Sequence, residues 1–582
     1  MIKNTPTICS FCSSGCGMFI RSDGKEAVGC LPMTLHPVSE GRLCHRGWNR
    51  FQNLRSFNRL SFPLVREGSN LKQVAWPEAL QKTTEKISEL LSRHGPQSIG
   101  VIGSPWLTNE DNFRIARFSC DVLGTNHLDG SYRFSGAAAL TALDRLFSGS
   151  FGSLGSIPSI AHSPTILVIG KESCRDFSPV GSRLIKAFLR GSTLVLADPL
   201  CTRKEHFFKA LLPHPIENLA TAFTKKESLP PEISNCLFEP GLALIFLADQ
   251  VDSASSLLSL LRSLSPRSAM ENPLPLMIPL SRSPNLKGAW DMGIRPAEGG
   301  LTLQEMLGEE SEVKGLLIFG DDLLNHLVTS SMLVKFKSLE FVLVADRFFT
   351  DTARTAHSVF PMPLLAETEG TMTNSEGRVQ KLRPFLDPQG ESRSVTHILH
   401  DLSRLLGKGF PVLSEPEVRK EISNNIPTYR SLASEAELEK VGGILLPSPT
   451  AQLTWELSES TEQGPGGYRL LVPNTLYAWN RNQMIHESPV LKIEYPSDRP
   501  AVRMNPLDAR ELKIRMGEKI RIRSDRGETQ IPVELDENIP SKVLMIPCHF
   551  TELVERLAGK AVHDGATRTV FFPNLSVSLE KI

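Results

Sequence analysis

The chain has 582 residues, 40% of them hydrophobic and 22% charged, and its 64 Lys and Arg residues balance its 64 Asp and Glu residues. This length exceeds what one hydrophobic core supports, so roughly three to four domains are expected. The balanced charge excludes the strong field that a nucleic-acid or anionic-membrane partner calls for. Because no apolar run approaches the ~18 residues of a membrane span and the N-terminus carries no leader pattern, we expect a cytoplasmic protein without a direct membrane span.

The first predicted element is a cysteine-rich module over residues 1–60. Its spacing is Cys9-x2-Cys12-x3-Cys16, followed after 27 residues by Cys44. Three thiolates on one turning loop and a fourth from a later loop suit a 4Fe–4S cluster. Zinc and disulfides are the alternatives, although zinc usually takes two separated cysteine pairs or a Cys/His set. The four cysteines are therefore predicted to be metal ligands.

Two other residues of this module need an interpretation. Cys30 lies between the third and fourth ligands and is interpreted as a bystander. Arg46 follows the fourth ligand by two positions. A cation there could lie between the cluster and an anionic cofactor, and the alternative is a solvated loop arginine.

The next range, 61–165, is predicted to be an α/β part that contributes to a cofactor cleft. Helical periodicity covers 76–93, and a short buried strand over 98–104 ends in Gly103-Ser104. A second helix is capped by the polar run 108–111.

Residues 166–300 are predicted to form a nucleotide-type α/β domain. A buried strand ends at Gly170, a helix follows over 179–190, and the next strand carries Asp198 at its carboxyl end. An acidic residue in that place can bind a nucleotide ribose, although the GxGxxG fingerprint is absent. A structural role for Asp198 is the alternative.

Residues 301–440 repeat this pattern. Strands over 314–320 and 340–346 end in Gly320 and Asp346, which echo Gly170 and Asp198. The repetition predicts two related nucleotide-type folds that face each other.

The remaining stretches differ in composition. Residues 288–293 are expected to be an irregular loop, and 366–383 are polar and rich in hydroxyl groups. The range 441–467 is interpreted as a linker because it is rich in Pro, Ser, Gly and Glu. From 468 to 582 the hydrophobic period changes to two, which predicts a six-stranded type of β-barrel.

This order of parts resembles the molybdopterin oxidoreductase superfamily, nearest to formate dehydrogenase alpha subunits and the complex I large iron–sulfur subunit. The fold class is therefore expected to be multidomain α/β, with an Fe–S module, two Rossmann-like domains and a C-terminal barrel. Seven stretches carry the resemblance: the cysteine set with Arg46; Gly103-Ser104 with 108–110; 124–126 with Asp129; 197–199 with Thr202; 288–293; 369–374; and 505–509 with 524–527.

The resemblance implies a 4Fe–4S cluster and molybdopterin guanine dinucleotide with molybdenum or tungsten. It makes 166–300 and 301–440 pterin-nucleotide domains and 468–582 the dinucleotide-binding barrel. The residues that it implies to contact these cofactors are Arg46, Gly103, Ser104, Asn109, Asn126, Gly170, Asp198, Thr202, Gly320, Asp346, Thr371, Asn374, Asn505 and Asp508.

The sequence departs from formate dehydrogenases at the metal-ligand position. Their cysteine or selenocysteine and the following histidine align with Ser135 and Gly136. Ser135 is a possible molybdenum or tungsten ligand, as a serine is in the dimethyl-sulfoxide reductase branch, and simple packing is the alternative.

Two functions remain open at this stage. The first is a formate dehydrogenase-like oxidoreductase subunit that passes electrons through its cluster to an iron–sulfur or flavin partner. The second is an electron-relay scaffold without a working metal centre, similar to the complex I subunit. The sequence shows no flavin or nicotinamide motif of its own.

Overall fold

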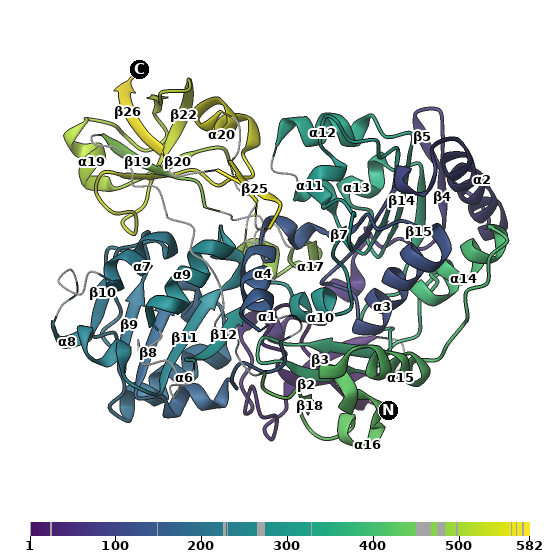
Figure 1. The fold of residues 1–582 in the computed structure, drawn as a ribbon, viewed down its shortest axis with the longest axis horizontal. Coiled ribbons are helices and arrows are strands. Elements are labelled where there is room, and N and C mark those ends of the chain that lie inside the picture. The colour runs from purple at the N-terminus through teal and green to yellow at the C-terminus, as the bar shows by residue number, and fades with distance from the viewer. Residues whose placement is uncertain are drawn as a thin grey trace. The chain divides into compact units, whose positions relative to one another are not determined.

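The structure is a computed structural model that describes residues 2–23, 26–147, 149, 151–224, 229, 231–264, 274–326, 329–449, 467–473, 483–495, 499–559, 562–565, 567–572 and 575–582. The chain divides into two compact units (Figure 1). The first contains Met1–Arg133, Ser281–Pro447 and Ala478–Pro496, and the second contains Phe134–Leu280, Ser448–Tyr477 and Ser497–Ile582. No helix in the described part of the chain combines the length and apolarity needed to cross a membrane.

The first unit begins with a small antiparallel sheet of three strands, β1 (Lys3–Ile8), β2 (Gly17–Ser22) and β3 (Ala27–Pro32). Residues 9–16, which we call the cluster loop, join β1 to β2 and contain three of the four predicted ligands. The fourth, Cys44, directly precedes the short helix α1 (His45–Trp48). The antiparallel pair therefore fixes both ends of the cluster loop.

The main sheet of the first unit has seven strands in the order β5-β4-β15-β14-β13-β6-β7. Its parallel centre is wholly buried, which explains why these strands read as continuous apolar runs. One sheet thus takes strands from the expected ranges 61–165 and 301–440. The strands are β4 (Leu64–Glu67), β5 (Asn70–Gln73), β6 (Ile99–Gly103), β7 (Leu128–Gly130), β13 (Gly315–Phe319), β14 (Phe341–Asp346) and β15 (Ser358–Pro361).

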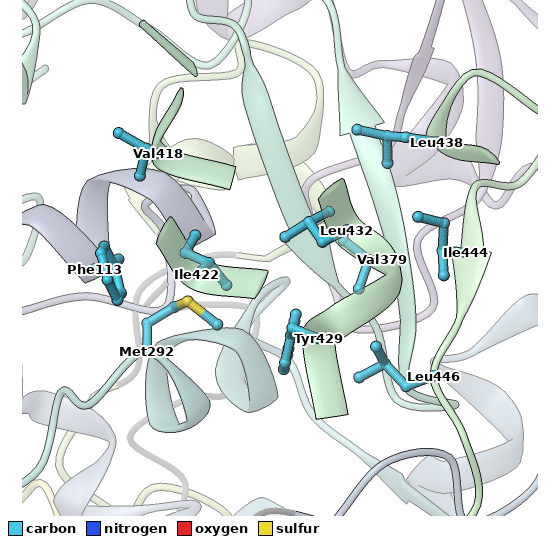
Figure 2. Close-up of a cluster of buried hydrophobic side chains, with 10 residues drawn as sticks. All are labelled: Phe113, Met292, Val379, Val418, Ile422, Tyr429, Leu432, Leu438, Ile444 and Leu446. Atoms are coloured by element: carbon cyan, nitrogen blue, oxygen red, sulfur yellow. The ribbon is translucent and has the colours of Figure 1, made fainter. Parts of the chain in front are cut away.

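A second small sheet of the first unit has the order β16-β17-β18. The hydroxyl-rich stretch forms the hairpin β16 (Gly370–Thr373) and β17 (Arg378–Leu382), and β18 (Ile444–Leu445) pairs with β17 inside the range expected to be a linker. Residues 450–466 of that range lie outside the described residues. An apolar cluster that includes Val379 and Tyr429 packs behind the hairpin (Figure 2).

The expectation of an irregular loop over 288–293 is wrong for residues 288–291. Helix α10 (Leu286–Asp291) occupies it and ends before Gly293, whose φ is 91°. A Cβ on Gly288 would lie 2.0 Å from both Asn109 Oδ1 and Asn285 Oδ1, so glycine permits a close approach there. The sequence pattern shows no helical period because the helix is short and all six of its residues are buried.

The other helices of the first unit cover its sheets or connect their strands. They are α2 (Trp76–His94), α3 (Asn109–Arg117), α11 (Leu303–Met306), α12 (Ser330–Lys337), α13 (Asp351–Thr355), α14 (Val395–Leu405), α15 (Glu415–Asn425), α16 (Glu435–Leu438), α17 (Gln483–His486) and α18 (Leu491–Glu494).

The second unit contains a parallel sheet in the order β10-β9-β8-β11-β12. Its strands are β8 (Thr165–Ile169), β9 (Thr193–Ala197), β10 (Ala210–Leu212), β11 (Leu242–Leu247) and β12 (Leu276–Leu280). The helices are α4 (Ala137–Leu146), α5 (Glu172–Arg175), α6 (Ser178–Leu189), α7 (Ile216–Thr224), α8 (Pro231–Ser234) and α9 (Ala254–Leu264).

The second unit also contains the C-terminal barrel, which closes in the order β19-β23-β20-β22-β21-β26. Six strands close it, as the change to a period of two predicted. The barrel strands are β19 (Tyr468–Leu471), β20 (Val502–Met504), β21 (Lys519–Arg523), β22 (Glu528–Leu535), β23 (Val543–Met545) and β26 (Leu575–Lys581). Helices α19 (Pro506–Glu511) and α20 (Thr551–Ala558) and the pair β24 (Val562–Asp564) and β25 (Thr569–Phe571) complete this part. The multidomain α/β architecture with a C-terminal barrel is confirmed.

Candidate metal centre and cofactor site

The cluster loop buries three cysteine sulfurs in one turn. Cys9, Cys12 and Cys16 are each less than 9% exposed, and Cys44 is half-buried. The Cys9 amide donates to the Cys16 carbonyl at 2.8 Å, which folds the loop back on itself. Burial, followed by the negative charge of the other cysteines, raises the pKa of Cys9 and Cys16 above the ordinary thiol value. As bare thiolates these groups would repel one another, and iron would remove that repulsion.

Two buried cations lie beside these sulfurs. Arg46 is 1% exposed and Arg50 is 6% exposed. Burial raises the pKa of Cys12 and Cys9, and the charges of Arg46 and Arg50, respectively, reduce that rise. The Arg50 Nε donates to Ser10 Oγ at 3.0 Å. Arg46 is therefore not a solvated loop arginine, and both cations offset negative charge on the sulfurs.

The β16–β17 hairpin holds the cluster loop through the loop's backbone. Asn374 Nδ2 donates to the Ser14 carbonyl at 3.0 Å, and Gln380 Nε2 donates to the Gly15 carbonyl at 2.9 Å. Between them, the Ser375 amide donates to the carbonyl of Ser13 at 2.8 Å. Asn374 thus positions the cluster loop, and its contact with the pterin cofactor, which the resemblance implied, stays a prediction.

Cys30 takes no part in this arrangement. Its Sγ donates to the carbonyls of Gly47 and Trp48 at 3.4 and 3.1 Å, and burial raises its pKa to about 11. No two of the ten cysteines form a disulfide. Among the described residues no group of three or more His, Cys, Asp or Glu side chains is arranged for a single metal ion, whereas the four thiolates of a cubane each bind a different iron.

Tyr495 is a neighbour of the cluster module that sequence reasoning missed. Arg46 Nη1 donates to Tyr495 Oη at 2.8 Å, and the His45 ring stacks on the tyrosine with centroids 5.7 Å apart. No local pattern signals this contact, because the arginine and the tyrosine are 449 positions apart in the chain.

The carboxyl edge of the main sheet of the first unit brings together four predicted cofactor residues. Gly103 ends β6 and Ser104 follows it, Gly320 follows β13, and Asp346 ends β14. Burial raises the pKa of Asp346 to about 6. This edge is where parallel sheets bind nucleotides.

Two further polar residues at this edge were not predicted. Asp321 is buried, and its Oδ2 accepts from Ser131 Oγ at 2.5 Å. Its Oδ1 has no hydrogen-bond partner among the described residues and lies 3.7 Å from His326 Nε2. Burial raises the pKa of Asp321 to about 8. Arg59 faces Asp346 and pairs with Glu367 at 2.5 Å, but its Nε and Nη1 have no hydrogen-bond partner in the described part of the chain. Buried groups left unsatisfied in this way fit an anionic, hydrogen-bonding cofactor.

Three predicted residues of the first unit make hydrogen bonds within this unit. Asn126 precedes β7 and lies at the amino edge of the sheet, where its Nδ2 donates to the Glu298 carbonyl at 2.8 Å. Asn109 Nδ2 donates to Thr371 Oγ1 at 3.0 Å, and the Thr371 amide donates to Glu110 at 2.7 Å. Asn126 is thus separated from the strand-end residues at the opposite edge.

In the second unit, Gly170 and Asp198 end neighbouring strands. The Asp198 carboxylate accepts from the amides of Lys171 at 2.8 Å and Leu200 at 2.7 Å, and burial raises its pKa to about 6. Thr202 Oγ1 donates to the Glu537 carbonyl at 2.8 Å. Asp198 therefore shapes both strand-end turns, and its role in binding a ribose stays a prediction.

The remaining predicted residues belong to the barrel and to α4. Asn505 Oδ1 accepts from the Leu507 amide at 2.8 Å and caps α19, while its Nδ2 donates to the Ile539 carbonyl at 2.7 Å. Asp508 accepts from Ser541 Oγ and the Lys542 amide, both at 2.6 Å. Ser135 is 5% exposed and lies two positions before the first residue of α4.

Comparison with protein families gives three matches along the chain. Residues 2–54 match the molybdopterin oxidoreductase Fe4S4 domain, residues 59–405 match molybdopterin oxidoreductase, and residues 468–570 match the molydopterin dinucleotide binding domain. The second match alone spans more than half of the 582 residues.

Curated proteins similar to the chain include two alpha subunits of F420-dependent formate dehydrogenases. The subunit of Methanocaldococcus jannaschii is 25% identical, over 100% of both chains. The subunit of enzyme 1 from Methanococcus maripaludis is 24% identical, over 99% of both chains. Among solved structures, acetylene hydratase from Pelobacter acetylenicus has a TM-score of 0.69 at 15% identity, covering 99% of this chain and 100% of that one.

Proposed function

Because the chain belongs to the molybdopterin oxidoreductase family, we propose that it is a redox subunit that passes electrons through its N-terminal cluster to a partner protein. It is formate dehydrogenase-like, with an Fe4S4 domain and a domain that binds molybdopterin guanine dinucleotide. Formate is the substrate to test first, since the alpha subunits similar to this chain are named for it.

The observation that carries the proposal is the environment of the cluster ligands. Cys9, Cys12 and Cys16 are buried, half-buried Cys44 lies beside them, and Arg46 and Arg50 place positive charge against the sulfurs. An iron–sulfur cluster bound there would supply one-electron transfer. The two arginines stabilise the electron-rich form, because each added electron makes the site more negative.

The dinucleotide cofactor would be held in part at the carboxyl edge of the main sheet of the first unit. Arg59 offers buried guanidinium nitrogens to an anionic group, and Asp321 offers a carboxyl group kept protonated by burial. A protonated carboxyl can donate a hydrogen bond to an acceptor on a bound ligand. Ser135 remains the candidate ligand for molybdenum or tungsten.

The proposal also covers partner and location. Alpha subunits work in multi-subunit enzymes, so we expect an iron–sulfur or flavin subunit as the electron partner. A cytoplasmic location stays a prediction from the sequence.

Metal analysis of anaerobically purified protein tests the proposal directly. We expect about four iron atoms and one molybdenum or tungsten atom per chain, extractable pterin, and formate-dependent reduction of a viologen dye. Ser135→Ala should lower the molybdenum or tungsten content and leave iron unchanged. Iron without molybdenum, tungsten or pterin would contradict the proposal and point to the relay scaffold.

A further inference from the structure

One cavity of the first unit shares no residue with the predicted cofactor site. Its volume is about 370 Å³, within the range of about 300–1,000 Å³ that is usual for small-molecule sites. Strand β17 lines it with Gln380 and Lys381, and Arg383, which directly follows that strand, also lines it. Its other walls come from β1, β2, residues 33–36 and residues 438–443. We call this cavity the β17 pocket.

The surface of the β17 pocket is mainly apolar. Ile8 and Leu438 are buried in its walls, and Phe19 is half-buried there. Two further lining residues, Leu35 and Val441, are 83% and 54% exposed, so they form the rim. Apolar side chains both inside the pocket and at its rim favour a ligand with an apolar body.

Two cations of the β17 pocket hold a carboxylate of the chain itself. Lys381 Nζ pairs with Glu439 Oε1 at 2.7 Å, and Arg383 Nη2 pairs with Glu439 Oε2 at 2.6 Å. Hydrogen bonds from these two cations lower the pKa of Glu439 to about 2. Lys381 also pairs with Glu435 and Glu369, at 3.3 and 3.5 Å. Because the Glu439 side chain is 48% exposed, its ion pairs are of the weak, exchangeable kind, and it marks where the carboxylate of a ligand would bind.

Two buried polar side chains of the β17 pocket have unused hydrogen-bonding atoms. Gln380 Nε2 donates to His36 Nε2 at 3.0 Å, and burial lowers the pKa of His36 to about 4. The neutral ring therefore carries its proton on Nδ1. His36 Nδ1 and Gln380 Oε1 have no hydrogen-bond partner within the part of the chain that the structure describes, although the two residues are only 2% and 1% exposed. Buried groups of this kind beside a cavity indicate a site for a bound molecule.

The same two side chains connect the β17 pocket to the cluster loop. Gln380 Nε2 also donates to the Gly15 carbonyl of that loop, at 2.9 Å. At the end of the loop, a Cβ on Gly17 would lie 2.2 Å from His36 Cδ2, so the ring packs directly against the backbone there. A negative charge bound in the pocket would disfavour the reduced, more negative form of a cluster. Occupation of the pocket is therefore expected to lower the midpoint potential of the cluster.

We propose that the β17 pocket is an effector site for a small carboxylate with an apolar body, which displaces Glu439 from Lys381 and Arg383. Glu439 is then an internal competitor of the ligand. Formate has no apolar body and would not fill the pocket, so this site is distinct from a substrate site. The binding does not depend on the proposed function, whereas the effect on the cluster rests on it.

Calorimetric titration of the anaerobically purified holoenzyme with 3-phenylpropanoate tests the binding. Acetate lacks the apolar body and 3-phenylpropanol lacks the carboxylate, so each should bind about tenfold more weakly or worse. Arg383→Gln should weaken the binding of 3-phenylpropanoate about tenfold or more. Glu439→Gln should strengthen it about twofold to fivefold, because a competing exposed ion pair is lost. Arg523→Gln and Glu528→Gln, which alter a similarly exposed ion pair in the barrel, are the matched controls and should bind like wild type.

A redox titration followed by electron paramagnetic resonance tests the effect on the cluster. Saturating 3-phenylpropanoate should lower the midpoint potential of wild type, and the same concentration should shift that of Arg383→Gln less. Unchanged binding in both Arg383→Gln and Glu439→Gln would overturn the site, and binding without a shift in wild type would overturn its effector role.

Two further outcomes separate the alternatives. A peptide with a C-terminal leucine that binds far more tightly than 3-phenylpropanoate would assign the β17 pocket to the end of a partner chain and overturn the choice of a small carboxylate. A purified protein without a cluster would contradict the proposed function alone, because the calorimetric titration measures the pocket without reference to the cluster.

Discussion

The cluster loop and residues 505–508 of the barrel, which we call the barrel motif, differ in whether their polar groups already have partners. In the barrel, the side-chain oxygens of Asn505 and Asp508 accept hydrogen bonds from amides and a hydroxyl of their own domain, at 2.6 to 2.8 Å. In the cluster loop the backbone is held just as firmly by the β16–β17 hairpin, but burial raises the pKa of the sulfurs that it presents.

Polar groups with partners in their own domain indicate a motif that stabilises the fold. Buried sulfurs with raised pKa values indicate a motif that binds a ligand. The carboxylate of Asp508 already has its partners, so nothing in its surroundings calls for another. The cysteines are held in place by their backbone, and their burial makes the thiolate form unfavourable. Metal binding removes this cost because the metal neutralises the thiolate charge. Each prediction below tests one side of this contrast.

The largest effect is expected from removing a cluster ligand. Cys12→Ala should abolish the reducible 4Fe–4S signal, because three thiolates cannot complete the cage. Electron paramagnetic resonance of the dithionite-reduced protein measures the signal, and iron analysis gives the content. Cys30→Ala is the matched control, since this buried thiol only donates to two carbonyls. An unchanged spectrum for Cys12→Ala would refute the ligand assignment.

The next effect concerns Asp321, which resembles the cysteines because it is buried with a raised pKa. Its folded pKa of about 8 lies above the ordinary value of 3.8, with Asp322 and Asp346 nearby. Between these values the unfolded chain releases a proton that the folded protein keeps, so raising the pH favours unfolding. Asp321→Asn should therefore gain about 2–3 kcal/mol of stability relative to wild type between pH 5.5 and 7.5.

Denaturant unfolding at several pH values measures this gain. Asp525→Asn provides the control, because the Asp525 side chain is 80% exposed. If the curves of wild type and Asp321→Asn stay parallel between pH 5.5 and 7.5, Asp321 does not hold the extra proton and the analogy with the cysteines fails.

A smaller effect is expected when the hydrogen bonds that hold the cluster loop are removed and its cysteines are kept. Asn374→Ala removes the donor to the Ser14 carbonyl and the acceptor of the amides of Glu376 and Arg378. Leaving such groups unsatisfied costs about 2 kcal/mol. The cluster should still form but lose iron to a chelator several-fold faster, followed by its visible absorbance. Asn538→Ala, which changes an exposed asparagine bonded only to Asp536, should leave the rate unchanged.

The sequence was sufficient for features that depend on local spacing. The cysteine pattern predicted that the sulfurs of the tight triple are buried on one loop, because close spacing keeps them together. The change of hydrophobic period identified the barrel, because strands alternate residue by residue. Strand-end residues such as Gly320 and Asp346 were found together for the same reason, since parallel strands end at one edge.

Features that depend on contacts between distant segments could not be predicted. The roles of Asn374 and Gln380 are decided by carbonyls some 360 residues away, and no periodicity encodes such a pairing. Tyr495 meets Arg46 for an equally non-local reason. The place of Asn126 at the amino edge of the sheet also could not be predicted, because its motif looks the same at either end of a strand.

The smallest predicted effect decides whether the barrel motif is structural alone. Asn505→Ala removes the cap of α19 and the donor to the Ile539 carbonyl, and loss of a cap costs about 1 kcal/mol. Asn505→Asp keeps the cap acceptor but loses the donor, so it should recover part of that stability. If the motif only builds the barrel, unfolding should shift while the pterin content and the cluster spectrum stay at wild-type values. If Asn505 also contacts the dinucleotide, as the family resemblance implies, extractable pterin should fall in both variants even where stability is partly restored, and the contrast between the two regions would then be one of degree.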